Sequence, residues 1–322
     1  MKKTDVIALG IAVMDILAAP ADKTLFERDN TPIDDIIVAA GGDAANQAAD
    51  LSGLGRSVSL CCRVGDDTLG QLFMEMLSSR GVDLSRVKIS PDSVTSAAIA
   101  LVSAEGQRNI LCRRGNNFDF CIDDIDMNKI ADATALSVGS LYGCPKLEES
   151  GLEDVLKHVQ NRGVKTFADM ASDKKGLKMA GLRPFLPYID YFMPSEAESL
   201  HLTDGLKCED AAEAFFDAGA KNIVIKLGAR GAYAHCRDYS GYVPAFQITA
   251  RDTTGAGDAF CAGFIHSLLS GAGTEAALSF ACACGAYNSL SLGAANAALD
   301  VQTIKRFIAK TKRRAAVLKE DE

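Results

Sequence analysis

The sequence Asp-Thr-Thr-Gly-Ala-Gly-Asp-Ala-Phe occupies residues 252–260 and is followed at once by an apolar stretch of helical periodicity that ends near Leu269. Gly255 and Gly257 allow backbone angles that direct consecutive N–H groups toward one point. The positive end of the helix dipole would add to the field at that point. The segment therefore predicts a phosphate-binding turn at the N-terminus of a helix.

Asp258 is an acid placed beside this predicted anion site. One interpretation is a general base that accepts the proton of a hydroxyl attacking a phosphoryl group, which would make the protein a kinase. The other is a structural cap, because Asp is common at helix N-termini. The segment alone leaves both interpretations open.

The composition indicates a single α/β domain with a large core, spanning residues 1–322 at 48% hydrophobic content. A net charge of −8 argues against nucleic acid or an anionic membrane surface as the main partner. The ten cysteines lack metal-like spacing, so we expect buried thiols in a cytoplasmic protein. The N-terminal apolar run is short and is typical of a first strand instead of a signal peptide.

Strand and helix patterns alternate along most of the chain, which predicts a mostly parallel βαβ sheet covered by helices. The expected strands are 6–9, 57–62, 135–138, 164–168, 191–193 and 222–226, and the expected helices are 41–54, 70–80, 148–161, 196–201, 210–218, 256–269, 274–290 and 301–318. Residues 11–40 and 94–120 instead carry alternating strands. We expect these two segments to form a small β-sheet that acts as a lid.

A second glycine cluster, Gly41-Gly42-Asp43-Ala44-Ala45-Asn46, lies at a loop-to-helix junction. Paired glycines let the backbone approach a ligand closely, and an asparagine amide both donates to and accepts from sugar hydroxyls. Asp15 follows the first strand and offers a carboxylate to vicinal hydroxyls. Such positions lie at the carboxyl ends of parallel strands, where small ligands bind.

Together these motifs resemble the ribokinase-like, or PfkB, family of carbohydrate kinases along essentially the whole chain. The resemblance is carried by the two glycine motifs and by Leu54-Gly55 and Val64-Gly65-Asp66-Asp67 between them. It implies a three-layer α/β/α ribokinase-like fold and transfer of the γ-phosphate of ATP to a sugar hydroxyl. By motif position it implies Asp258 as catalytic base, the anion hole Gly255, Ala256 and Gly257, and the sugar-binding set Asp15, Gly41, Gly42 and Asn46.

The same resemblance implies a nucleotide site formed by Lys226, Gly228, Gly231 and Thr253, with Mg²⁺ as the metal. One position departs from the family pattern. The family commonly has Asn-x-x-Glu after a strand, and here Ser195 stands in place of the asparagine while Glu198 keeps the acid. We expect magnesium dependence to survive, with Glu198 acting indirectly. Asp252 resembles part of a K⁺ site found in some members.

The acceptor is less well defined by the sequence. Asp43 disfavours an anionic acceptor, whereas Arg108, on a lid strand, favours a carboxylate or phosphate, and Phe118 and Phe120 offer rings that could stack on a nucleobase. Our order is a neutral ribose- or fructose-type sugar, then a nucleoside, then a sugar acid. A catalytically silent sugar or nucleotide sensor is the alternative of a different class. Exposed lid strands suggest a homodimer formed through the lid.

Overall fold

The computed structural model describes residues 4–103, 108–291, 293 and 299–314. An eight-stranded sheet has the order β14-β13-β12-β11-β10-β9-β1-β4. The strands from β4 to β12 in this order are parallel, and β13 and β14 are antiparallel additions at one edge. Their bounds are β1 Thr4–Leu9, β4 Val58–Cys61, β9 Ala133–Leu141, β10 Lys165–Met170, β11 Tyr191–Phe192, β12 Ile223–Lys226, β13 Gly231–His235 and β14 Ser240–Pro244.

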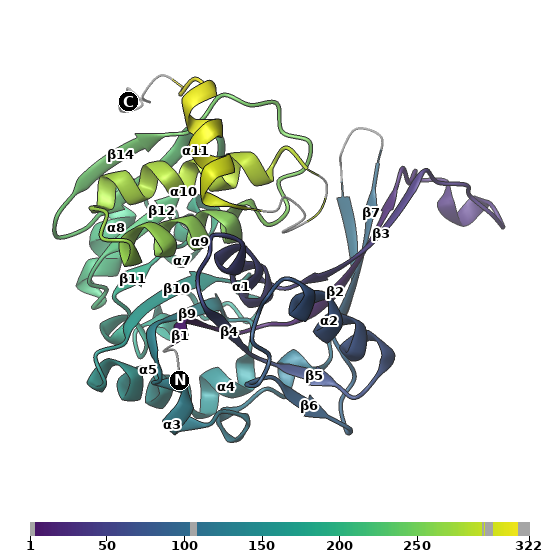
Figure 1. The fold of residues 1–322 in the computed structure, drawn as a ribbon, viewed down its shortest axis with the longest axis horizontal. Helices are drawn as coiled ribbons and strands as arrows, with labels where there is room; N and C mark the ends of the chain where they lie inside the picture. Colours follow the sequence, from purple (N-terminus) through teal and green to yellow (C-terminus); the bar gives the residue numbers. More distant parts are fainter. Residues whose placement is uncertain (1–3, 104–107, 292, 294–298, 315–322) are drawn as a thin grey trace.

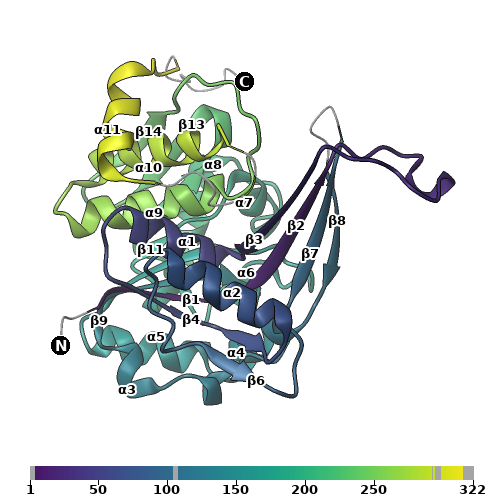
Figure 2. The same ribbon diagram turned by 45° about the vertical axis from the view of Figure 1, so that its right-hand side comes forward.

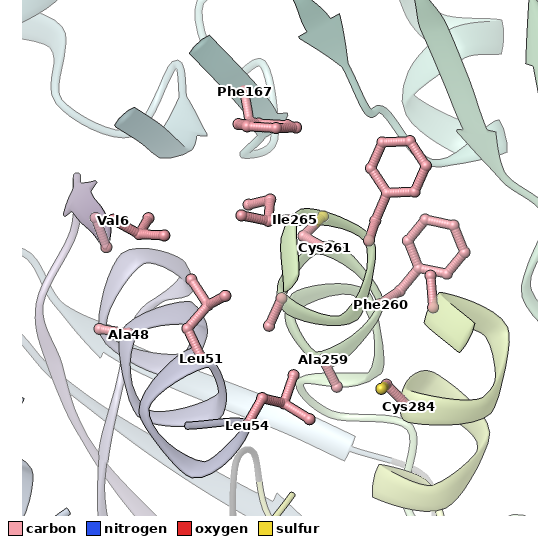
Figure 3. Close-up of a cluster of buried hydrophobic side chains, with 14 of the residues drawn as sticks. Val6, Ala48, Leu51, Leu54, Phe167, Ala259, Phe260, Cys261, Ile265 and Cys284 are labelled. Carbon is pink, nitrogen blue, oxygen red and sulfur yellow. The ribbon is translucent and has the colours of Figure 1, made fainter. Parts of the chain in front are cut away.

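Helices cover both faces of this sheet (Figure 1). The helices are α1 Asp43–Gly53, α2 Thr68–Ser79, α3 Met127–Ile130, α4 Pro145–Ser150, α5 Leu152–Asn161, α6 Lys178–Leu182, α7 Glu196–Leu202, α8 Cys208–Asp217, α9 Ala256–Leu269, α10 Thr274–Asn288 and α11 Val301–Lys310. Because side chains alternate along a strand, β1 supplies side chains to two hydrophobic cores, one on each face of the main sheet. Val6 and Ala8 pack with α1, α9 and α10, whereas Ile7 and Leu9 pack with α5 and α8. Figure 3 shows the first of these cores.

A four-stranded sheet of order β3-β2-β7-β8 projects away from the main sheet (Figure 2). It is built from β2 Val13–Ala19, β3 Asp35–Gly41, β7 Ala97–Val102 and β8 Arg108–Arg113. A third, two-stranded sheet pairs β5 Arg63–Gly65 with β6 Lys88–Ser90. The three-layer α/β/α arrangement and the separate small sheet confirm the fold expected from the sequence.

Several element boundaries differ from the sequence-based expectation. The helix predicted from Gly41 begins at Asp43, because Gly41 ends β3 and Gly42 adopts a φ of 93°. The helix predicted over 148–161 is divided at Gly151, where a Cβ atom would lie 2.5 Å from the side chain of Ile122. The hairpin β13–β14 was not predicted.

The last helix ends at Lys310, although the periodicity predicted a helix to Leu318. The residues that follow pair with another segment of the chain: Phe246 and Arg313 form an antiparallel bridge. Residues 315–318 lie outside the described part. Eight of the ten cysteines are buried, as the sequence predicted, while Cys208 is half-buried and Cys112 is exposed. In the part of the chain that the structure describes, no helix is long and apolar enough to cross a membrane.

Candidate active site

A cavity of about 470 Å³ opens where the carboxyl ends of β10 and β12 meet the first turn of α9. It is lined by many of the residues expected from the sequence, namely Ser195, Glu198, Lys226, Gly228, Gly231, Thr253, Gly255, Ala256, Gly257 and Asp258. Ligands bind at this edge in α/β sheets because strand ends and helix N-termini meet there. The structure therefore brings the predicted nucleotide residues and the predicted catalytic turn into one cavity.

The turn at the start of α9 depends on Gly255. This residue is the N-cap and has a φ of 73°, in the left-handed region that favours glycine. Among the described residues, no side chain caps this helix. Asp258 lies in the first turn of the helix and is only 7% exposed. The structure therefore assigns no capping role to Asp258, which removes the simpler interpretation of that residue.

The carboxylate of Asp258 is held by two side chains of α1. Asn46 Nδ2 donates to Oδ2 at 2.9 Å, and Gln47 Nε2 donates to Oδ1 at 3.4 Å. Gln47 is itself fixed, because its Oε1 accepts a hydrogen bond of 2.7 Å from the Ser137 hydroxyl of β9. Asn46 was expected to contact a sugar; the contact that the structure shows is with the predicted base. Sequence reasoning did not find Gln47.

Burial raises the pKa of Asp258 well above its ordinary value, and the nearby carboxylates of Asp43 and Asp169 raise it further. The hydrogen bond from Asn46 and the charge of Lys226 act in the opposite direction. A carboxylate with a raised pKa is a stronger base than an exposed aspartate. This suits a group that accepts a proton from an alcohol.

Lys226, at the end of β12, forms an ion pair with Asp169 of β10. A Cβ atom on Gly257 would lie 3.4 Å from Lys226 Nζ, so the ammonium sits beside the amide turn of α9. Burial tends to lower the pKa of Lys226, but the charges of Asp169 and Glu198 outweigh it and raise that pKa. The cavity thus holds a permanent cation next to the predicted anion hole.

Asp169 was not singled out as a site residue in the sequence analysis. It comes one residue after the predicted strand 164–168, and its side chain also accepts a hydrogen bond of 3.3 Å from the Cys261 thiol. A carboxylate directly after a buried parallel strand is the signal that singled out Asp15, and the same signal could have found Asp169.

Asp15 and the paired glycines form the junction between the small sheet and α1. A Cβ atom on Gly41 would lie 2.0 Å from Asp15 Oδ2, and one on Gly42 would lie 2.6 Å from the carbonyl oxygen of Ile11. A side chain at Gly42 would therefore collide with backbone, and one at Gly41 would displace the Asp15 carboxylate. Burial raises the pKa of Asp15 to about 6.

Asp43 begins α1 and lines the cavity. Its Oδ2 accepts a hydrogen bond of 2.9 Å from the Ser140 hydroxyl. Burial, and then the charge of Asp169, raise the pKa of Asp43 to about 7. The glycine junction therefore adds a second acidic side chain close to Asp258.

Arg108 is not brought to this junction. Asp15 pairs with Ala98 of β7, whereas Arg108 of β8 pairs with Val102, four residues farther along the same strand. Each residue of a strand advances about 3.3 Å, so the Arg108 backbone lies toward the far end of the small sheet. The Arg108 side chain is outside the described part.

Ser195 and Glu198 form a capping box at the start of α7. Glu198 N donates to Ser195 Oγ at 3.3 Å, and Ser195 N donates to Glu198 Oε2 at 2.6 Å. Burial, partly opposed by Lys226, raises the pKa of Glu198. The serine that replaces the expected asparagine thus keeps a structural task and faces the cavity at the same time.

Asp252 orders the loop before α9. Its Oδ1 accepts from Thr254 N at 2.9 Å, and its Oδ2 accepts from Gly293 N at 2.8 Å. The Thr254 carbonyl in turn accepts from Asn288 Nδ2 at 2.8 Å. The segment expected to bind a monovalent cation, residues 285–296, is described only in part.

The two aromatic candidates for stacking on a nucleobase differ in position. Phe120 is 1% exposed and packs in the core with Ile7 and Leu9, so the expectation that it contacts a ligand is wrong. Phe118 is 38% exposed, and the guanidinium of Arg114 lies 5.0 Å from its ring centre.

Residues 3–301 match the family described as pfkB family carbohydrate kinase. The chain belongs to this family. It is 27% identical over 283 residues to a deoxyribokinase of Salmonella typhi, covering 84% of this chain and 88% of that protein. It is 32% identical over 257 residues to an ATP-dependent ribose-1-phosphate kinase of Halopiger xanaduensis, covering 80% of this chain and 82% of that protein.

Solved structures show the same fold. A putative ribokinase II from E. coli, in complex with ATP and Mg²⁺, has a TM-score of 0.84 at 23% identity and covers 95% of this chain and 99% of that one. A ribokinase from Thermotoga maritima has a TM-score of 0.79 at 24% identity. The protein is thus a kinase of the pfkB family with a ribokinase-like fold, and the family resemblance inferred from the two glycine motifs is confirmed.

Proposed function

We propose that this pfkB family kinase transfers the γ-phosphate of ATP to a hydroxyl of a small neutral sugar, with Asp258 as general base. The observation that carries the proposal is the buried Asp258 carboxylate, held by Asn46 and Gln47 at the mouth of α9 with Lys226 beside the same turn. This arrangement supplies a base and an anion site within one cavity.

Phosphoryl transfer requires an acceptor oxygen in line with the γ-phosphate and neutralisation of the charge that develops on the equatorial oxygens. The backbone amides of Gly255, Ala256 and Gly257 meet the second requirement together with the Lys226 ammonium. Asp258 meets the first by accepting the hydrogen bond, and then the proton, of the acceptor hydroxyl. Asp169 acts as a positioning residue, because its carboxylate holds Lys226 at the turn.

The carboxylates that face the cavity fit a bound magnesium ion. Mg²⁺ is usually held by one or two carboxylates, nucleotide phosphates and water, and it shares the neutralisation of phosphate charge. Glu198, with Ser195 beside it, is the residue that we assign to this role, whereas Asp169 is already paired with Lys226. For K⁺ we retain Asp252 as a candidate, to be tested by exchanging K⁺ for Na⁺ in the assay.

The nucleotide would lie with its phosphates toward Lys226 and its base toward the apolar end of the cavity. Gly228 and Gly231 flank the turn between β12 and β13, and both line the cavity. Gly231 cannot be replaced without movement, because a Cβ atom there would lie 2.0 Å from the Val243 carbonyl oxygen. Thr253 lines the cavity next to the catalytic turn.

Charge favours a neutral acceptor over a sugar acid or sugar phosphate. Asp15, Asp43 and Asp258 place three carboxyl groups around the glycine junction, and the adjacent Lys226 is already paired with Asp169. An anionic acceptor would be repelled there. A nucleoside is the second candidate, because the exposed ring of Phe118 could stack on its base. To bind an anionic acceptor, Arg108 would have to act from the far end of the small sheet.

We further propose that residues 1–322 form one domain in which the small sheet, with its segments 11–40 and 94–120, closes over the acceptor and excludes water. Its outer part exposes Val38, Ile99 and Leu111, which are 38%, 39% and 54% exposed. A second copy of the chain would cover this apolar row. A homodimer through the small sheet is therefore part of the proposal.

The test is ADP release with ATP and Mg²⁺ over a panel of ribose, 2-deoxyribose, fructose, 2-keto-3-deoxygluconate, ribose 1-phosphate, adenosine and uridine. We expect release with a neutral sugar and a loss of about 10²–10⁴-fold in kcat for Asp258→Asn, which should still fold and bind ATP. Near-normal turnover in Asp258→Asn would remove that residue from the base role. Release with only ribose 1-phosphate or the sugar acid would overturn the assignment of a neutral acceptor.

A further inference from the structure

The chain turns back toward the cavity after α11. Gln247 N donates to the Lys312 carbonyl at 2.8 Å, and Arg314 N donates to the Ala245 carbonyl at 2.8 Å. Residues 312–314, which we call the C-terminal strand segment, thereby pair in antiparallel fashion with residues 245–247, just after β14. A segment that the periodicity predicted to be helical is instead part of the wall of a site.

The pairing is fixed by side chains as well as by backbone. The guanidinium of Arg313 lies 4.9 Å from the ring centre of Phe246, and it also bonds to the Ser279 hydroxyl of α10. Phe246 is 2% exposed and lines the cavity. Arg313 therefore anchors the segment to the wall of the cavity.

Arg314, the next residue, lines the cavity itself. Arg314 is exposed, its backbone is bonded to Ala245, and it shares this end of the cavity lining with the apolar residues Ala245, Phe246, Ile248, Ala250, Cys282 and Ala286. Lys226 and the amide turn of α9 lie at the other end of the cavity, which we assign to the nucleotide phosphates. A guanidinium among apolar walls can stack on a planar ring and donate hydrogen bonds to ring nitrogens or sugar oxygens.

We propose that Arg314 is a nucleotide-binding residue that contacts the base and ribose of ATP. The proposal rests on the assignment of this cavity to ATP under the proposed function. The C-terminal strand segment delivers the contact, because two backbone hydrogen bonds and the Arg313 anchor set the place of the Arg314 backbone.

The test compares Arg314→Ala with Lys312→Ala in the full-length chain. Lys312 is exposed and contributes only its backbone carbonyl to the pairing, so it is a matched control. Affinity for ATP is measured by calorimetry with Mg²⁺, and inorganic tripolyphosphate is measured as a competitor of ATP. We expect Arg314→Ala to weaken ATP binding roughly three- to tenfold, as for loss of an ordinary hydrogen bond, and to leave tripolyphosphate unaffected.

Unchanged ATP affinity in Arg314→Ala would overturn the proposal, and so would an equal loss for tripolyphosphate, which would place the guanidinium on the phosphates. A loss of the same size in Lys312→Ala would show that the segment matters only as structure and would also overturn it. Failure of the proposed function gives a different result, namely no acceptor-dependent ADP release by the unaltered chain. In active enzyme, Arg314→Ala should raise KM for ATP and leave KM for the sugar unchanged.

Discussion

Asn46 Nδ2 lies 2.9 Å from Asp258 Oδ2, and this hydrogen bond joins residues 212 positions apart in the chain. It links the first helix to the first turn of α9. The glycine-rich junction at the small sheet and the glycine-rich turn at α9 therefore form one site. The bond also stabilises the ionised form of Asp258 against the effect of its burial.

Asp43→Asn should move the acidic limb of the kcat/KM profile to lower pH. The charge of Asp43 raises the pKa of Asp258, so its removal lowers that pKa and keeps the base ionised at lower pH. Asparagine retains an oxygen that can accept from Ser140. We expect a shift of roughly one pH unit, with the exposed Asp92→Asn as control. An acidic limb that stays in place would show that Asp258 does not titrate as the base.

Lys226→Met should affect stability and catalysis in separable ways. It leaves the buried Asp169 carboxylate unpaired, which we expect to cost about 3–5 kcal/mol of stability. It should also lower kcat by about 10²–10³-fold through loss of charge at the anion hole. The double variant Lys226→Met/Asp169→Asn should recover much of the thermal stability but not kcat. Recovery of both would assign Lys226 a structural role only.

Asp50→Asn should stabilise the protein, and increasingly so as pH rises. Asp50 lies in α1, is 2% exposed, and its Oδ2 has no hydrogen-bond partner among the residues that the structure describes. Burial raises its pKa to about 8, so the native state holds a proton that the unfolded state releases, and stability falls between about pH 4 and pH 8. An asparagine at this position does not titrate and contributes no such dependence of stability on pH. Melting temperatures of the two proteins should be similar at pH 4 and should diverge by pH 8; equal differences at both values would contradict the prediction.

The unaltered chain should show the mass of a dimer in light scattering. Ile16 pairs with Val38 and Ile99, and Ile99 pairs with Leu111, so these side chains form one row on one face of the small sheet. Leu111→Lys should yield monomers, whereas Ile110→Lys, at an exposed residue of the opposite face, should not. A single monomer mass for the unaltered chain at all concentrations would exclude the dimer.

Much of the fold followed from local pattern. Alternating strand and helix periods gave the parallel sheet, and the β-alternation of residues 11–40 and 94–120 gave the small sheet. The pattern failed where a contact overrode periodicity. Gly151 interrupts a helical period because Ile122 packs against it, and the chain after Lys310 leaves the helix to pair with residues 245–247.

The sequence by itself determined the family and the composition of the proposed catalytic turn, because glycine geometry, helix dipoles and strand-end carboxylates are local properties of the chain. Only the tertiary structure decided which side chains meet. Asn46 and Gln47 reach Asp258, Asp169 holds Lys226, Phe120 enters the core, and Arg314 lines the cavity. These contacts depend on the packing of elements far apart in sequence, and no local periodicity encodes the distance between two such side chains.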